Sequence, residues 1–236
     1  MDLFYIIISA LAPVTIALWY ILKKDRTQPE PTGLLAKAFI LGVFSAPLSL
    51  LFSNPLEELF ELDLIDNPSI VDAIADAFFM AAIPEELAKF IMLWLALRRN
   101  PHFDEKFDGI VYAVCVGMGF AGIENIIYLF DGLEDGTWVG IGISRALFSI
   151  PGHFFNAILM GYYYGLNHFG IDRSIKCKIM ILMAPILAHG IYDSIVMAID
   201  IDDNENFTLV IIFVFLYFCN KLRKIGKEKI NSLLNQ

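Results

Sequence analysis

Charged residues are scarce in this chain of 236 residues, where Asp, Glu, Lys and Arg make up 18%, against roughly 25% in ordinary soluble domains. Cysteine is scarcer still, and Cys115, Cys177 and Cys219 all lie in or near apolar segments. Three cysteines without close spacing argue against a disulfide framework and against a cysteine-based zinc site. The N-terminus also lacks the basic residues that precede the apolar run of a cleaved signal, because its basic cluster follows at 23–26. We therefore expect the first apolar segment to be a membrane span.

Apolar residues make up 57% of the chain. They occur in runs of about 20 residues, the length that crosses ~30 Å of hydrocarbon. Seven such spans can be drawn, at residues 3–22, 34–53, 71–97, 108–130, 138–166, 177–199 and 206–220. The sequence therefore predicts an all-α, polytopic integral membrane bundle of about seven transmembrane helices, a multi-pass protein of the cell membrane.

The basic residues are sorted by loop. All but three of the 17 Lys and Arg residues lie in loops 23–33, 98–107 and 167–176, at Lys178, or in the tail from 221, and the alternate loops have none. By the positive-inside rule, this pattern predicts that the N-terminus is outside and the C-terminus cytoplasmic. The net charge of −9 is the sum of these sorted loops, and we expect no nucleic-acid partner.

We expect one membrane domain, residues 1–236. The only long connection is 54–70, which contains two Asn-Pro pairs as breakers and is predicted to form a short interfacial helix from Leu56 to Ile65. Gly161 and Gly165 have the spacing of small residues that lets two helices approach closely. We expect this contact to lie within the bundle and not at a dimer seam.

The most informative stretch is Pro84 to Lys89, in the middle of an otherwise apolar span. It places Glu85, Glu86 and Lys89 in hydrocarbon, where each ionisable group costs about 2.5–3.5 kcal/mol on insertion scales. A purely structural ion pair is the plainer interpretation, but neutral residues would avoid this desolvation cost. We therefore interpret the stretch as part of an intramembrane active site, with the catalytic helices within about 71–199.

Three further spans carry polar residues that complete the set. Depths counted along each span suggest two tiers, a deep one near the midplane and a shallower one nearer the outer face, with Lys89 a turn closer to the cytoplasm. The deep tier is Glu85, Glu86, His153 and His189, and the shallow tier is Glu124, Asn125, Arg145 and Asp193. We expect Arg145 to pair with Glu124 or Asp193. The alternatives are a core histidine, a supporting network at Glu124 and Asn125, and an Arg145 that snorkels to the interface.

Several of these residues share a helix face because they are four apart: Glu85 with Lys89, His189 with Asp193, Glu124 with Tyr128, and Arg145 with Ser149 and then His153. Glu86 points about 100° away from Glu85, so only one of the two need face the reacting centre. A proline precedes a deep polar residue at Pro84, Pro151 and Pro185. Proline leaves a helix carbonyl unpaired and bends the axis, which would suit a cavity that admits water.

The residue types favour hydrolysis by activated water. Burial raises the pKa of a carboxyl group toward neutrality and makes it a useful base. A histidine with an aspartate one turn away could polarise a carbonyl or stabilise an oxyanion. No serine or cysteine has a convincing histidine partner, because a Ser/His pair such as Ser149 and His153 is common by chance.

The polar motifs resemble those of the PrsW intramembrane proteases, which are similar to the larger superfamily of CAAX prenyl proteases and bacteriocin-processing enzymes. The resemblance covers about residues 75–195. Its motifs are Glu85-Glu86-x-x-Lys89, Gly119-Phe-Ala-Gly-Ile-Glu124-Asn125-x-x-Tyr128, Arg145 followed by His153, and His189-Gly-x-Tyr192-Asp193. It implies hydrolysis of a peptide bond of a single-span, membrane-anchored protein, as in anti-sigma-factor processing on the extracytoplasmic side.

The resemblance also implies roles. A glutamate of Glu85-Glu86 and His153 would activate water, and His189 and Asp193 would stabilise the oxyanion. The prenyl proteases have an arginine one residue after the position of Lys89, and a phenylalanine four residues before the histidine, where this chain has Ser149. These departures leave the choice of glutamate open and argue against a CAAX substrate.

Two other functions stay open. A zinc-dependent protease could use Glu85, His153 and His189 as ligands, although no HExxH motif occurs; otherwise we expect no cofactor. A proton-coupled transporter also uses buried Glu, His and Asp residues. The substrate, the cleavage site and the oligomeric state cannot be predicted from this sequence.

Overall fold

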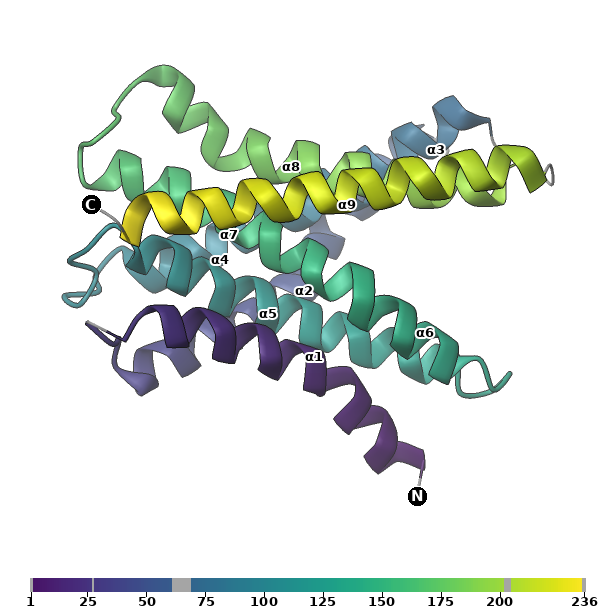
Figure 1. Ribbon diagram of the computed structural model, residues 1–236, viewed down its shortest axis with the longest axis horizontal. Helices are drawn as coiled ribbons and strands as arrows, with labels where there is room; N and C mark the ends of the chain where they lie inside the picture. The colour runs from purple at the N-terminus through teal and green to yellow at the C-terminus, as the bar shows by residue number, and fades with distance from the viewer. Residues whose placement is uncertain (1, 27, 61–68, 202–204, 235–236) are drawn as a thin grey trace.

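The protein is described by a computed structural model that covers residues 2–26, 28–60, 69–201 and 205–234. Within these ranges it is all-helical, with no strand. The helices run along the long axis of a bundle, with the C-terminus at one end and the N-terminus toward the other (Figure 1). The predicted all-α helical bundle is therefore confirmed.

Four single helices are long and apolar enough to cross a membrane: α1 (Asp2–Lys24), α2 (Thr32–Phe60), α5 (Asp108–Asp131) and α8 (Ile175–Met197). Two predicted spans are interrupted by π-helical turns. The span at 71–97 comprises α3 (Ile70–Asp76), the π turn Ala77–Ala82 and α4 (Ile83–Leu97). The span at 138–166 comprises α6 (Trp138–Ser144), the π turn Arg145–Ser149 and α7 (Ile150–His168). A 3₁₀ turn, Ala198–Asp200, precedes α9 (Glu205–Leu234).

Two predicted boundaries are wrong. The Asn54-Pro55 pair does not end a helix, because α2 continues to Phe60; the rest of the predicted interfacial helix lies outside the described residues. The last predicted span, 206–220, is only the first half of α9, which continues through the basic tail to Leu234. Both errors lengthen helices and leave their order unchanged.

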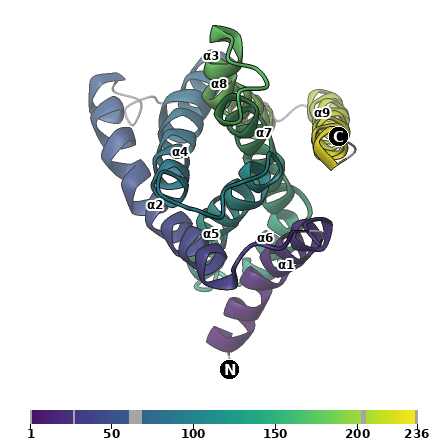
Figure 2. The same ribbon diagram turned by 90° about the vertical axis from the view of Figure 1, so that its left-hand side faces the viewer.

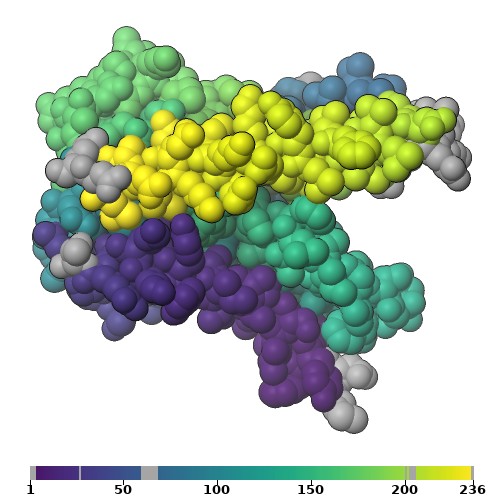
Figure 3. Space-filling view, viewed as in Figure 1, coloured from purple at the N-terminus to yellow at the C-terminus, as the bar shows by residue number. Residues whose placement is uncertain are grey.

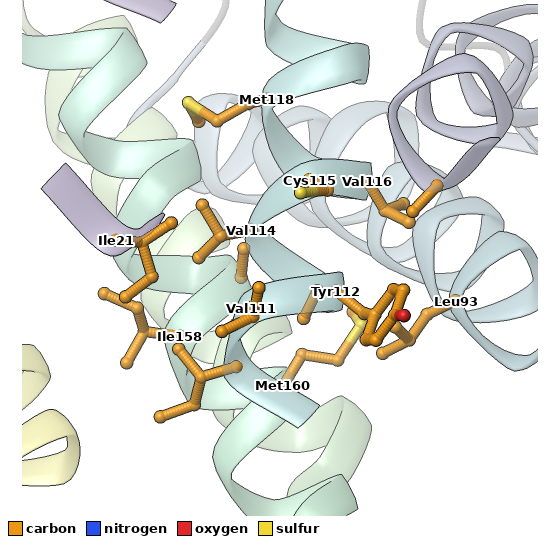
Figure 4. Packing of buried hydrophobic residues seen from close by; sticks show 14 of the residues in the cluster. Ile21, Leu93, Val111, Tyr112, Val114, Cys115, Val116, Met118, Ile158 and Met160 are labelled. Carbon is orange, nitrogen blue, oxygen red and sulfur yellow. The ribbon is translucent and has the colours of Figure 1, made fainter. Parts of the chain in front are cut away.

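Helix α5 lies at the centre of the bundle, with α1, α2, α4 and α7 around it (Figure 2). It is buried on nearly all sides over most of its length, as a helix that is hydrophobic all round should be. Figure 4 shows its side chains meeting Ile21 of α1, Leu93 of α4 and Ile158 of α7, all fully buried. Close packing of this kind holds helices together where no water is present.

The outside of the bundle is apolar. Large exposed hydrophobic side chains occur on α1, α2, α8 and α9, among them Trp19, Leu51, Ile175 and Phe213. A soluble protein would not expose so many, since large contiguous apolar patches on a monomer mark contacts with other molecules or with lipid. These surfaces, with the four long apolar helices, are those of a membrane protein.

Small residues form the seam between α5 and α7. A Cβ atom added to Gly109 would lie 2.7 Å from the Gly161 carbonyl oxygen, and one added to Gly165 would lie 2.6 Å from the Lys106 carbonyl oxygen. Real Cβ atoms do not approach so closely, so only glycine permits this spacing. The prediction that Gly161 and Gly165 make a contact within the bundle is confirmed.

Gly161→Ala is therefore expected to lower the stability of the purified protein by about 1–3 kcal/mol, the usual effect of overpacking. The measurement is thermal unfolding in detergent. Gly140→Ala is the matched control, because a Cβ at this helical position meets nothing within 4 Å and alanine favours the helix. Equal melting temperatures for the two variants would contradict the close approach of α5 and α7.

Candidate active site

The polar residues of four helical segments meet around one cavity of about 110 Å³. The space is large enough for several water molecules. The segments are α4, α5, α8 and the α7 segment with its preceding π turn, which are grouped around the middle of the bundle in Figure 2. The cavity is lined by Ala81, Glu85, Glu124, Tyr128, Arg145, Ser149, Gly152, His153, Asn156, His189, Tyr192, Asp193, Met197 and Leu222. All but Leu222 fall within the predicted catalytic region.

Lys89 is held by two carboxylates of its own helix. Its Nζ donates to Glu85 Oε2 at 3.0 Å and to Glu86 Oε1 at 2.9 Å, as the i,i+4 and i,i+3 spacings allow. The ammonium also lies 3.9 Å from the centre of the Phe120 ring, a favourable cation–π geometry. The backbone of Lys89 lies one turn after Glu85 on α4, and its long side chain brings the ammonium back to the two glutamates.

The two glutamates differ in what they face. Glu85 lines the cavity, whereas Glu86 is 1% exposed and is not among the lining residues. Glu86 Oε2 is buried and has no hydrogen-bond partner among the described residues. The geometry thus separates a cavity-facing carboxylate from a fully enclosed one.

His189 lies between three carboxylates. Its Nδ1 is 3.0 Å from Glu86 Oε1, and its Nε2 is 3.1 Å from Asp193 Oδ2 and 3.8 Å from Glu85 Oε2. Because ionised carboxylates only accept hydrogen bonds, the imidazole satisfies both sides when both of its nitrogens carry protons. A cationic imidazolium at the cavity wall is the result.

His153 connects the two predicted tiers. Its Nδ1 lies 3.2 Å from Lys89 Nζ, and its Nε2 lies 2.8 Å from Glu124 Oε2. An ammonium can only donate, so Nδ1 accepts and the proton is on Nε2, which donates to Glu124. Glu124, which was predicted in the shallow tier, thus contacts His153, which was predicted in the deep one.

Arg145 is buried and does not snorkel. Its Nη2 donates to Glu124 Oε2 at 2.6 Å, its Nε donates to Asn125 Oδ1 at 2.8 Å, and its guanidinium lies 4.0 Å from the centre of the Tyr128 ring. Asn125 in turn donates through Nδ2 to the Ala10 carbonyl at 2.9 Å. The interfacial alternative for Arg145 is wrong, and of its two predicted partners, Glu124 and Asp193, the guanidinium pairs with Glu124.

Each π turn is followed directly by a proline at the second position of an α-helix, Pro84 in α4 and Pro151 in α7. Proline cannot donate the backbone hydrogen bond that would continue a regular helix, and π turns occur often at functional sites. The two irregular stretches lie just before Glu85 and His153. They set the direction in which these side chains leave their helices.

Sequence reasoning missed several lining residues. Tyr192 was part of a quoted motif without a role, and its hydroxyl lies 3.5 Å from Ser149 Oγ. Asn156, one turn after His153, is 3% exposed, and its Oδ1 has no partner among the described residues. Leu222 comes from α9, far along the chain, and no local pattern indicates its place. The i,i+3 spacing of His153 and Asn156 was the one available signal.

The metal alternative can be tested against the donor set. Glu85, Glu86, His153 and His189 offer ligand atoms within 4.8 Å of one another, and carboxylate oxygens with imidazole nitrogens suit zinc. However, Lys89 Nζ is hydrogen-bonded to three of these four residues, Glu85, Glu86 and His153. A metal ion would have to displace this ammonium, so the residues as arranged do not fit a resident metal.

The sequence matches known proteins over most of its length. Residues 30–219 match the family described as PrsW family intramembrane metalloprotease. The chain is 34% identical to Protease PrsW of Clostridioides difficile, over 100% of this chain and 92% of that protein. It is 31% identical to Protease PrsW of Bacillus subtilis, over 96% and 97% of the two chains.

A third relative, Protease PrsW of Oceanobacillus iheyensis, is 30% identical over 98% of this chain and 99% of its own. No solved structure matches the chain. The family match covers all four polar segments that meet at the cavity. The chain belongs to the PrsW family of intramembrane proteases.

Proposed function

We propose that this protease is an endopeptidase that cuts a membrane-anchored protein with a water molecule activated by Glu85, without a metal. The observation that carries the proposal is that one carboxylate faces the cavity beside a histidine whose two ring nitrogens are both hydrogen-bonded. Glu85 lines the cavity, and its Oε2 lies 3.8 Å from His189 Nε2. A base and an electrophile placed together within a water-sized space are what peptide hydrolysis requires.

Glu85 is the proposed base because Glu86 has no access to water. Both oxygens of Glu86 are enclosed, and its Oε1 is occupied by Lys89 and His189. The ion pair with Lys89 restrains Glu85 but leaves its carboxylate at the cavity surface. We assign Glu86 to holding Lys89 and His189 in place.

In the proposed reaction, Glu85 takes a proton from water while the water oxygen bonds to the scissile carbonyl carbon. The carbonyl oxygen becomes an oxyanion, which the positive charge of the His189 imidazolium stabilises while Glu86 and Asp193 hold the ring through Nδ1 and Nε2. The carbon–nitrogen bond then breaks, and the leaving amine takes the proton from Glu85. A carboxylic acid and an amine are released, and Glu85 is a carboxylate again.

His153 has a positioning role in this scheme. The family resemblance implies that it activates water with the glutamate, but both of its nitrogens are engaged by Lys89 and Glu124. We propose that it fixes these two groups relative to Glu85, and that it reaches water only by exchanging one of the two bonds. Asn156 also lines the cavity, and its buried Oδ1 has no hydrogen-bond partner among the described residues.

The substrate proposed is a single-span protein of the cell membrane, as in anti-sigma-factor processing. Figure 3 supports a lateral approach, because the molecule is hollowed between α9 and α6 at the end opposite the C-terminus. Phe215 of α9 packs against Phe148 and Tyr192, with ring centres 5.1 and 5.2 Å apart. With the basic C-terminal end in the cytoplasm, the opening faces the extracytoplasmic side.

The test is cleavage of a candidate single-span protein by the purified enzyme in liposomes, with and without a strong chelator. We expect cleavage to change by less than about twofold on chelation, because the Lys89 ammonium takes the place that a metal would need. Fragments are identified by mass spectrometry.

A loss of cleavage on chelation that zinc restores would overturn the metal-free mechanism while leaving the protease. Substrate flux into the liposomes without peptide fragments would instead favour the transporter alternative, which uses the same buried residues. A His153→Ala enzyme that cleaves as well as the natural one would remove this cavity from the mechanism.

A further inference from the structure

A second group of carboxylates lies far from the active site, at the end of the bundle where the C-terminus is found (Figure 1). Asp25 and Glu30 come from the connection between α1 and α2. Glu105 precedes α5, and Asp108 is its first residue. Oxygen atoms of Asp25, Glu105 and Asp108 lie within 4.8 Å of one another. Three carboxylates from two separate loops therefore converge on one point.

Two of these carboxylates are buried and incompletely satisfied. Asp25 is 2% exposed and Asp108 is 0% exposed. The Oδ1 atom of each is buried without a hydrogen-bond partner among the described residues. Burying a carboxylate oxygen without a hydrogen-bond partner costs free energy. A ligand bound to these two oxygens would offset that cost.

The remaining oxygens are fixed by the surrounding backbone. Asp108 Oδ2 accepts from the N–H groups of Asp104 and Glu105 at 3.1 and 2.8 Å. Asp25 Oδ2 accepts from the Glu30 N–H at 3.4 Å, and Glu30 accepts from the Tyr112 hydroxyl. One oxygen of each aspartate is thus held by the backbone, while its Oδ1 has no hydrogen-bond partner among the described residues.

The negative charge of the group is only partly offset by its basic neighbours. Lys106 interacts electrostatically with the Glu105 carboxylate, and His102 does so with the Glu30 carboxylate. Asp25 also lies near the carboxylates of Glu105 and Glu30, whose negative charges repel its own. An additional positive charge among these oxygens would relieve this repulsion.

We propose that Asp25, Glu105 and Asp108 bind a hard divalent cation, Mg²⁺ or Ca²⁺, at a structural site. Carboxylate oxygens are the ligands such ions prefer, and the donors include no nitrogen or sulfur that would favour zinc. The bound ion ties the α1–α2 connection to the start of α5, the central helix. Because α5 carries Glu124 and packs against α2 and α7, the ion fixes the bundle at the end remote from the chemistry.

The experiment is thermal unfolding of the purified full chain in detergent, first stripped with EDTA and then supplied with MgCl₂ or CaCl₂ in separate arms. We expect one or both ions to raise the melting temperature by about 5–10 °C at a hundred times the dissociation constant. Asp25→Asn, which keeps the shape and removes one charge, should lose most of this rise. Glu134→Gln, which alters an exposed carboxylate at the other end of the chain's fold, should keep it. Luminescence of bound Tb³⁺, excited through the nearby Tyr112, gives a direct reading of binding.

Four outcomes would overturn the proposal. One is no rise in melting temperature and no Tb³⁺ signal in the natural chain. Another is an equal rise in Asp25→Asn. The third is a rise that Asp25→Asn keeps and Glu85→Gln loses, which would place the ion in the active-site cavity. A higher melting temperature of Asp25→Asn in EDTA, without any ion response of the natural chain, would show that a proton neutralises the group instead. The result does not depend on the proposed mechanism, since none of these measurements uses cleavage.

Discussion

Glu85→Gln is expected to lower kcat for cleavage of a membrane-anchored substrate by roughly 10²–10⁴-fold, the usual contribution of a general base. Glutamine keeps the size of the side chain but cannot take a proton from water. The change is also mild for the fold, because Glu85 is at the cavity surface and Lys89 keeps its bond to Glu86. The measurement is the cleavage rate in liposomes, with the melting temperature recorded on the same preparation.

Glu86→Gln is the matched comparison, since it makes the same chemical change one residue later. It weakens the enclosed contacts to Lys89 and His189, so we expect a lower melting temperature with a smaller loss of kcat. If Glu86→Gln lost cleavage as completely while Glu85→Gln remained active, the assignment of Glu85 as base would be wrong.

Lys89→Met is expected to destabilise the protein by about 3–5 kcal/mol, the usual effect of removing one partner of a buried ion pair. Methionine fills a similar volume but leaves Glu85 and Glu86 next to each other without the ammonium. It also removes the hydrogen bond to His153 Nδ1. The measurement is thermal unfolding in detergent, accompanied by the yield of folded protein.

Lys37→Met serves as the control because Lys37 is an exposed lysine on α2. It should change the melting temperature little. A double variant, Lys89→Met with Glu86→Gln, should recover part of the loss, since one of the two unpaired charges is then gone. A melting temperature of Lys89→Met equal to that of Lys37→Met would mean that the two glutamates do not depend on this ammonium.

The contacts that sequence could predict are those within one helix. Glu85 with Lys89 and His189 with Asp193 are four residues apart, and the helical period alone brings them together. Among the polar contacts between helices, the sequence predicted only that Arg145 pairs with Glu124 or Asp193, without choosing between them. Depth along a span is known only to about a turn, and the π turns change the direction of every side chain that follows them. The bonds from His153 to Glu124 and from His189 to Glu86 therefore needed coordinates.

The fold shows the same division. Helix order and the apolar spans follow from composition, because the bilayer leaves few alternatives to a helix. Helix ends do not follow so simply. Pro55 was expected to end α2, but the helix continues past it, as membrane helices often do when neighbours satisfy the freed carbonyl. The last helix was expected to end before the basic tail. Instead, α9 continues through the tail as an amphipathic segment.

The π turns at Ala77–Ala82 and Arg145–Ser149 have a mechanical consequence. Each contains one more residue than an α-helical turn requires, so the residues after it are shifted by one position relative to a regular helix. If such a turn migrated, the segment it passed through would rotate by about 100° and move by ~1.5 Å, with nearly every backbone hydrogen bond remade. Glu85 and His153 each follow such a turn within a few residues. Each π turn thus precedes one of the reacting groups. Its migration would realign the side chain of Glu85 or His153 without unfolding a helix in lipid.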